Sequence, residues 1–186
     1  MRKVIASEFV SLDGVMEDPS WTFQFSSDEQ QKFKFDELFA SDALLMGRVT
    51  YEGFAAAWPG RTDEAGFAER MNGLPKYVVS RTLEEPLEWD NSTLIEGDVA
   101  EAVAGLKQQP GQDVLIYGSG ELVSTLMQHD LIDEYRLMVF RVVVGGGKRL
   151  FEDAAETTVL KLVDTKTFDS GVVVLTYEPA EKEAEG

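Results

Sequence analysis

Hydrophobic and polar positions along the chain predict strands and helices in regular alternation. Short apolar runs of strand length are followed by stretches in which apolar residues recur at helical spacing. Up to residue 120, strands are predicted over residues 3–10, 43–46, 76–80, 93–95 and 114–117, and helices over 28–40, 48–58, 64–71 and 99–107. This order is typical of an α/β fold with a largely parallel sheet.

The last third of the chain has a different pattern. After one more predicted helix just beyond residue 120, residues 132–144 are rich in β-branched and aromatic side chains, which favours a strand. Strands predicted over 159–168 and 172–177 flank Asp169-Ser170-Gly171, a sequence typical of a hairpin turn. We therefore expect a mixed sheet, mainly parallel and flanked by helices, that finishes with antiparallel strands.

The sequence predicts one domain over residues 1–178, followed by a polar, acidic tail over residues 179–186 that we expect to be flexible. Residues 135–144 (YRLMVFRVVV) form a long apolar strand that we expect to lie at a sheet edge. Because natural proteins cover such edges, we predict a homodimer.

The amino-acid composition excludes several classes of ligand and of active site. The formal net charge of -17 opposes binding to nucleic acid or anionic lipid. The absence of cysteine excludes disulfides, thiolate metal sites and cysteine nucleophiles, and the single histidine, His129, is expected at the surface near a helix end. No apolar run has the length of a membrane span and no signal-peptide core is evident, so we expect a cytoplasmic protein without a metal site.

Three junctions share one design, in which a short apolar strand ends in Gly or Ser and a helix or a charged residue follows. They occur within residues 44–54, 77–83 and 116–122. Carboxyl ends of parallel strands gather at one edge of a sheet, where helix N-termini offer unpaired N–H groups to anions. We therefore expect all three junctions at that edge.

Each of the first two junctions combines a turn with donors for a phosphate. Gly47 permits close approach of the backbone, and Arg48 and Thr50 follow in the first helical turn. Ser80 and Arg81 stand at the second strand end, where a guanidinium can bind a terminal phosphate through two hydrogen bonds. The alternative at both places is an ordinary turn followed by a solvated charge.

The third junction, Gly118-Ser119-Gly120, begins like a dinucleotide-binding fingerprint. The third glycine of that fingerprint is missing, because Val123 stands in its place. The segment is therefore either a phosphate cradle or the corner between a strand and a helix. Three donor-rich strand ends along one edge can hold the length of a dinucleotide, which favours the cradle.

Five segments in this order resemble the dihydrofolate reductase superfamily, in the branch of the reductase domain of bacterial riboflavin biosynthesis proteins: residues 5–16 (IASEFVSLDGVM), 44–59 (LLMGRVTYEGFAAAWP), 76–83 (KYVVSRTL), 116–137 (IYGSGELVSTLMQHDLIDEYRL) and 142–151 (VVVGGGKRLF). The resemblance implies a three-layer α/β sandwich, NADPH as cofactor, and hydride transfer to a small heterocyclic substrate that is pterin- or pyrimidine-like. The alternative is an NADPH-binding or sensing module without turnover.

The resemblance also implies roles for individual residues. Ala6 and the loop Gly14-Val15-Met16 are expected beside the nicotinamide. Ser80 and Arg81 are expected at the 2′-phosphate, so that Arg81 favours NADPH over NADH. The residues expected to line the diphosphate are Gly47, Arg48, Thr50, Gly118, Ser119, Gly120, Glu121 and Leu122.

Hydride transfer to a C=N or C=O bond requires a proton source nearby. The first long helix carries Asp28, Glu29, Asp36 and Glu37, without a clear match to the carboxylate that folate-reducing members of the superfamily use, so Asp28 is a secondary candidate. The resemblance makes Asp13 the better candidate for a substrate contact or for proton handling; its alternative is an Asx turn. The glycine-rich segment 142–151 is either a flexible loop near the ligand or a β-bulge and turn at the sheet edge.

Overall fold

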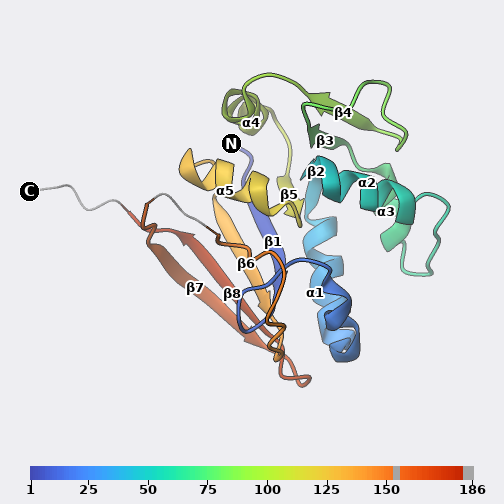
Figure 1. Ribbon diagram of the computed structural model, residues 1–186. Helices are drawn as coiled ribbons and strands as arrows, with labels where there is room; N and C mark the ends of the chain where they lie inside the picture. The colour runs from blue at the N-terminus through green and yellow to red at the C-terminus, as the bar shows by residue number, and fades with distance from the viewer. Residues whose placement is uncertain (153–155, 182–186) are drawn as a thin grey trace, which may run out of the picture.

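The computed structural model describes residues 1–152 and 156–181. Within these residues, the chain forms an eight-stranded sheet with the strand order β4-β3-β2-β5-β1-β6-β8-β7 (Figure 1). Neighbouring strands from β4 to β6 in this order are parallel, and β8 is antiparallel to β6 and to β7. The prediction of a mainly parallel sheet with antiparallel C-terminal strands is confirmed. The strands are β1 (Val4–Val10), β2 (Ser41–Gly47), β3 (Lys76–Val79), β4 (Ser92–Ile95), β5 (Asp113–Tyr117), β6 (Glu134–Val139), β7 (Leu160–Thr167) and β8 (Val173–Pro179).

Helices cover both faces of the sheet and make a three-layer α/β sandwich (Figure 1). One face carries α1 (Asp28–Phe39), α2 (Arg48–Ala57) and α3 (Phe67–Gly73), and the other carries α4 (Val99–Gln108) and α5 (Gly120–Gln128). A 3₁₀ helix, η1 (Pro19–Phe25), lies within the connection before α1. In the part of the chain that the structure describes, no helix has the length and hydrophobicity to cross a membrane.

Helix starts follow the capping signals in the sequence. The Ser27 hydroxyl accepts a hydrogen bond from the Gln30 N–H, so α1 begins where it was predicted. Helix α3 begins three residues later than predicted, at Phe67. The cause is Asp63, whose carboxylate accepts the N–H groups of Phe67 (3.0 Å) and Ala68 (2.6 Å) and fixes the turn before the helix.

The prediction that residues 135–144 lie at a sheet edge is wrong. Strand β6 pairs with β1 on one side and with β8 on the other, and it ends at Val139. Beyond Phe140 the chain leaves the sheet, because the N–H of Leu12 bonds to the carbonyl of Val142 and draws this segment toward the loop after β1. The edge strands of the sheet are β4 and β7, so the predicted homodimer needs another surface.

The C-terminal hairpin has the predicted turn. The N–H of Phe168 bonds to the carbonyl of Val172, and Gly171 has a φ of 83°, a conformation that glycine adopts without strain. Strand β8 continues to Pro179, and the N–H of Ala180 still bonds to the carbonyl of Val159. The start of the predicted tail therefore belongs to the hairpin, and its residues 182–186 lie outside the described residues.

Candidate active site

Strands β1 and β5 part at their carboxyl ends. They pair from Val4 and Val114 to Ser7 and Tyr117, after which the chain turns from β5 into α5. Strand β1 continues alone beside β6 as far as Val10. We call this point, just beyond Ser7 and Tyr117, the β1–β5 fork. Open α/β sheets bind ligands where the chain leaves adjacent strands in different directions, so the fork is the place to look for a site.

The three junctions predicted from the sequence lie at the same edge, next to the fork. They follow β3, β2 and β5, which are consecutive strands of the sheet. Neighbouring strands are about 4.8 Å apart, so Ser80, Gly47 and Gly118 follow one another over a width of about 10 Å. The structure thus brings together the residues that the sequence suggested as donors for one extended anionic ligand.

The turn from β5 into α5 has an unusual backbone. Gly118 and Ser119 both have positive φ, 56° and 61°, which is uncommon for a serine and turns the chain sharply into the helix. A Cβ atom on Gly118 would come within 2.9 Å of the Thr50 hydroxyl, and one on Gly120 within 2.6 Å of the Met16 sulfur. A side chain is therefore disfavoured at Gly118, where φ is also positive, whereas at Gly120 the flexible Met16 side chain would have to move.

The Ser119 hydroxyl connects the first and third junctions. It accepts a hydrogen bond from the Gly47 N–H at 3.0 Å and lies 3.0 Å from the Thr50 hydroxyl. An added Cβ on Gly47 would meet only the Ser119 side chain, at 3.9 Å, so the backbone there is approachable. The two helix starts are consequently held as one unit.

The predicted arginines differ in their environment. Arg48 pairs with Glu52 one helical turn on, at 2.9 Å, and both side chains are about half exposed. Arg81 is exposed, and within the described residues its side chain makes no hydrogen bond or ion pair. The neighbouring Ser80 hydroxyl accepts the N–H groups of Thr82 and Leu83, which fixes the turn that presents Arg81.

Three other residues were predicted to line the cofactor, and their side chains do not offer polar groups to it, so they can contribute only through their backbone or their small size. Ala6 is fully buried in β1, and Leu122 is buried in the core beneath α5. The Glu121 side chain is 93% exposed and lies 3.4 Å from the Lys148 ammonium group, so its carboxylate does not face the turn that ends at Gly120.

Residues 11–17 and 142–149 form two loops that hold each other. The Asp13 carboxylate accepts hydrogen bonds from the Ser11 hydroxyl (2.5 Å) and from the N–H groups of Val144 (3.1 Å) and Gly145 (2.8 Å). Gly14 has a positive φ, Val15 forms a bridge with Arg149, and Met16 donates its N–H to the Lys148 carbonyl. The glycine-rich segment is therefore a loop fixed to the loop after β1 rather than a bulge within a strand.

These contacts change what Asp13 can do. The Ser11 hydroxyl and the two backbone N–H groups lower the pKa of Asp13 to about 2. A group that is ionised at neutral pH has no proton to donate, so the geometry does not support proton handling. Asp13 does not form the predicted Asx turn either, because its carboxylate bonds to the other loop and the N–H of Val15 bonds to the Ser11 hydroxyl. Asp28 is exposed in the first turn of α1, where a carboxylate stabilises the helix N-terminus, and no described contact links it to the fork.

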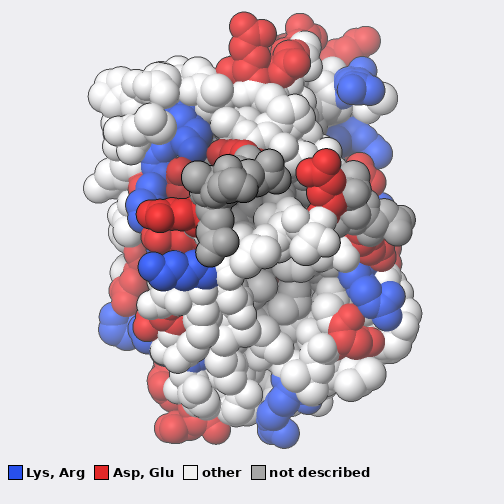
Figure 2. Space-filling model, turned by 90° about the vertical axis from the view of Figure 1, so that its left-hand side faces the viewer, with Lys and Arg blue, Asp and Glu red and all other residues white. Residues whose placement is uncertain are grey.

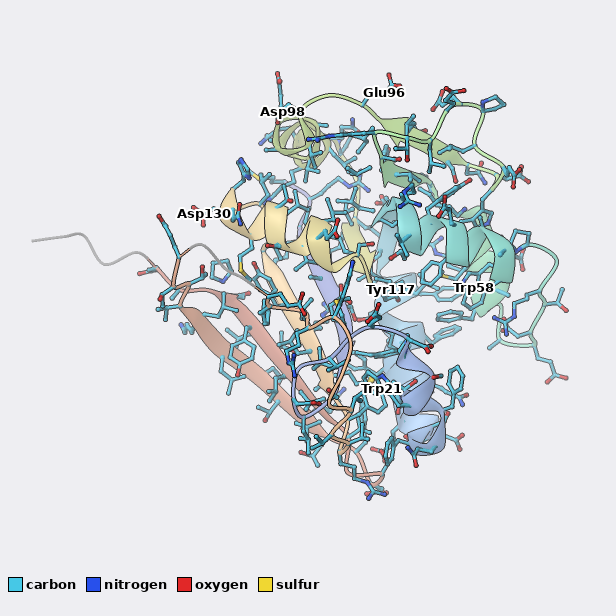
Figure 3. All side chains as sticks on the ribbon, in the orientation of Figure 1. Trp21, Trp58, Glu96, Asp98, Tyr117 and Asp130 are labelled. Atoms are coloured by element: carbon cyan, nitrogen blue, oxygen red, sulfur yellow. The ribbon has the colours of Figure 1, made fainter. Side chains whose placement is uncertain are left out.

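A buried polar cluster at the fork was not singled out from the sequence. Glu37 of α1 lies 2.5 Å from the Lys34 ammonium group, and it accepts hydrogen bonds from the Ser7 hydroxyl at 2.9 Å and the Tyr117 hydroxyl at 3.2 Å. Arg136 of β6 adds a second cation at 3.5 Å. Figure 3 shows Tyr117 between α5 and α1, at the centre of the molecule. Burial, and then the charge of Glu37, raise the pKa of Tyr117 well above its ordinary value.

Glu8 was also missed. Its side chain belongs to the stretch of β1 that runs past the fork, it is 2% exposed, and its Oε1 atom has no hydrogen-bond partner among the described residues. The available signal was an acidic residue inside a mainly apolar strand, VIASEFV. Periodicity alone gave no reason to separate it from a surface position.

Comparisons with known proteins identify relatives of the whole chain. The RibD C-terminal domain family matches residues 2–174. The chain is 34% identical over 180 residues to the uncharacterised protein YyaP of Bacillus subtilis, covering 95% of this chain and 94% of that protein.

Two solved structures share the fold. One is a putative riboflavin biosynthesis protein from Shewanella, with a TM-score of 0.76 and 22% identity, covering 97% of this chain and 100% of that one. The other is a diaminohydroxyphosphoribosylaminopyrimidine deaminase/5-amino-6-(5-phosphoribosylamino)uracil reductase from Thermotoga maritima, with a TM-score of 0.66 and 16% identity. It is matched over 96% of this chain and 57% of its own length.

Proposed function

Because the chain belongs to the RibD C-terminal domain family, we propose that it is an NADPH-dependent reductase that acts on a small heterocyclic substrate, pyrimidine- or pterin-like, in the cytoplasm. Membership confirms the resemblance inferred from the five segments. The observation that carries the proposal is the alignment of three donor-bearing strand ends beside the β1–β5 fork.

The residues along this edge suit a dinucleotide. NADPH, when bound, supplies the hydride. The Ser119 hydroxyl accepts the Gly47 N–H and so ties the start of α5 to the start of α2, and the two adjacent helix N-termini suit a diphosphate. Met16, against Gly120, would cover the end of the cofactor nearest the fork.

The net charge of the molecule makes an unpaired cation such as Arg81 important for binding an anionic cofactor. The molecule carries a formal net charge of -17, which repels an anionic ligand at long range. Arg81 is exposed and unpaired within the described residues, whereas Arg48 is already paired with Glu52. We therefore infer that Arg81 binds the 2′-phosphate, the only group by which NADPH differs from NADH.

One observation supports a second candidate function. The carboxylate proposed from the sequence as a proton source, Asp13, is ionised and bound to backbone N–H groups. A fold that binds NADPH without a proton donor would be a binding or sensing module. The experiment below tests cofactor binding, which both candidates require, and turnover then separates them.

The test is a paired titration with NADPH and NADH, followed through quenching of tryptophan fluorescence in the wild type, Arg81→Ala and Lys161→Ala. Lys161 is an exposed cation on β7, so it controls for the loss of one positive charge. We expect Arg81→Ala to weaken NADPH binding by about 2 kcal/mol, a Kd increase of about 30-fold, with little change for NADH. Equal losses for both nucleotides, or for both variants, would contradict the role of Arg81. No saturable binding by the wild type would contradict the proposed cofactor.

A further inference from the structure

Among the described residues, Glu8 is the least exposed acidic residue, at 2%. It follows Ser7, the last residue of β1 that is paired with β5, so it stands at the first position beyond the fork. On its other side β1 is still paired with β6, where Leu137 is its register partner. The residue therefore belongs to a strand paired on one side only, at the position where the sheet loses its other neighbour.

The surroundings of Glu8 disfavour its charge. Burial raises the pKa of Glu8 well above its ordinary value; Lys34 and the backbone N–H of Gly118 oppose this effect, and Glu37 adds to it. Lys34 is already paired with another carboxylate, because its ammonium group lies 2.5 Å from Glu37 and 3.0 Å from the Ser7 hydroxyl. From β6, the register neighbour Leu137 brings no charge.

The carboxyl groups of Glu37 and Glu8, both at the fork, therefore have different surroundings. Glu37 has two cations and two hydroxyl groups around its oxygens. Glu8 has no ion-pair partner among the described residues, and its Oε1 atom is buried and without a hydrogen bond. A buried polar atom of this kind costs stability unless a ligand or a water satisfies it, so the unpartnered Oε1 atom points to a ligand at the fork.

We propose that the Glu8 carboxyl group donates the proton that accompanies hydride transfer, a role that rests on the reductase function proposed above. The hydride adds with its electron pair to the carbon of a C=N or C=O bond, whose π electrons pass to the nitrogen or oxygen. That atom takes the proton from the Glu8 O–H group. Glu8 is left as a carboxylate and regains a proton from water, and the nicotinamide is left oxidised.

The protonation of Glu8 can be measured without any ligand. Between the ordinary pKa of a glutamate, about 4.3, and the raised value, the folded protein holds one more proton than the unfolded chain. Folding stability therefore falls as pH rises through that interval, and the unfolding equilibrium constant increases by up to about tenfold per pH unit. We expect Glu8→Gln to remove this pH dependence, whereas Glu96→Gln retains it.

Glu96 is the matched control because it is exposed and lies far from Tyr117 in Figure 3. Urea unfolding of the wild type and both variants from pH 4.5 to pH 8 gives the comparison. If the Glu8→Gln and wild-type curves have the same pH dependence, Glu8 is an ordinary ionised carboxylate and the proposal is overturned.

The catalytic role needs a second measurement. The probe is 5-amino-6-(5-phosphoribosylamino)uracil, together with a panel of pyrimidines and pterins that carry C=N or C=O bonds, with NADPH oxidation as the readout. We expect Glu8→Gln to lower kcat by about 100-fold to 10,000-fold, to abolish the fall of activity at high pH, and to leave the Kd of NADPH within about twofold. Glu8→Asp should restore part of the rate.

The outcomes separate the two proposals. A Glu8→Gln variant that has lost the pH dependence of stability but keeps kcat within about twofold overturns proton donation and leaves Glu8 as a structural acid. If the wild type binds NADPH but reduces none of the probes, the reductase function fails and the proton step fails with it. The stability comparison would still report the protonation of Glu8 in that case.

Discussion

At the scale of single residues, Asp13 joins two loops that are far apart in the sequence. Its carboxylate spans the Ser11 hydroxyl in its own loop and the N–H groups of Val144 and Gly145 in the other. The side chain of Arg149 adds a hydrogen bond to the Asp13 carbonyl. The residue thus shapes the loop that carries Val15 and Met16 toward the β5–α5 turn.

We expect Asp13→Asn to destabilise the protein at neutral pH. Because its pKa is lowered to about 2, the folded state favours the ionised form; the stability this contributes is present above the unfolded value of about 3.9 and is lost as pH falls to about 2. The variant should therefore have a lower Tm than the wild type at pH 7, and the difference should shrink below pH 4. Thermal unfolding monitored by circular dichroism measures both.

The same variant separates the roles considered for Asp13. If Asp13 fixes the loops, kcat should fall by less than about tenfold, since removal of a general acid costs about 100-fold or more. A loss of 100-fold with unchanged Tm would instead restore Asp13 as the proton-handling residue.

At the scale of elements, the β5–α5 turn contains one residue in a strained conformation, Ser119. Two consecutive residues, Gly118 and Ser119, adopt positive φ, and the serine pays a steric cost that its hydroxyl contacts with Gly47 and Thr50 offset. Strain of this kind persists where the surrounding structure fixes it, and it is common at ligand sites. The turn consequently presents its N–H groups in one arrangement before any ligand arrives.

Replacing Gly118 by alanine, which adds one methyl group, tests whether the cofactor uses this turn. Gly118→Ala places a Cβ 2.9 Å from the Thr50 hydroxyl at a φ of 56°, so we expect a loss of about 1–2 kcal/mol in unfolding free energy and at least tenfold weaker NADPH binding. The matched control is Gly105→Ala in α4, where nothing lies within 4 Å and the change should stabilise the protein by about 0.5–1 kcal/mol. Urea unfolding and nucleotide titration measure the two effects. Normal affinity in Gly118→Ala would mean that the cofactor does not use this turn.

Local sequence signals predicted the elements well and the long-range arrangement less well. Junctions such as Gly118-Ser119-Gly120 were found because a glycine directly after an apolar run has a local physical cause. The position of β6 was predicted wrongly, since pairing on both sides depends on β1 and β8, and no residue within β6 reports which strands will flank it. The cluster around Glu37 was missed for the same reason, because Arg136, 99 residues away, completes it.

At the scale of the whole molecule, β7 is a sheet edge with unusually exposed side chains. Leu162 and Val163 of β7 are 48% and 43% exposed, and Val159, just before the strand, is 68% exposed, although β-strand edges of soluble proteins are normally protected. Figure 2 shows this side of the molecule, with a broad uncharged area bordered by acidic and basic residues. A second copy of the chain would cover the apolar side chains and pair the edge, which supports a homodimer through β7.

Light scattering tests this interface. At micromolar concentration we expect a mass of two chains for the wild type and of one chain for the double variant Leu162→Lys/Val163→Lys, because two charges would be buried without partners. Ala56→Lys on the exposed face of α2 adds a charge elsewhere and should remain a dimer. A wild-type mass of one chain would contradict the homodimer, and a dimeric double variant would move the interface away from β7.

The β1–β5 fork separates the sheet into two halves that carry different parts of the candidate site. Strands β4, β3, β2 and β5 carry the three junctions proposed to bind the cofactor phosphates, whereas β1, β6, β8 and β7 carry Glu8, Arg136 and the loop held by Asp13. The halves are joined along four residue pairs, from Val4 and Val114 to Ser7 and Tyr117. Under the proposed function, substitutions on the second half can therefore change which substrate ring is accepted while the first half stays constant. One cofactor module can in this way be inherited unchanged through a lineage whose substrates diverge.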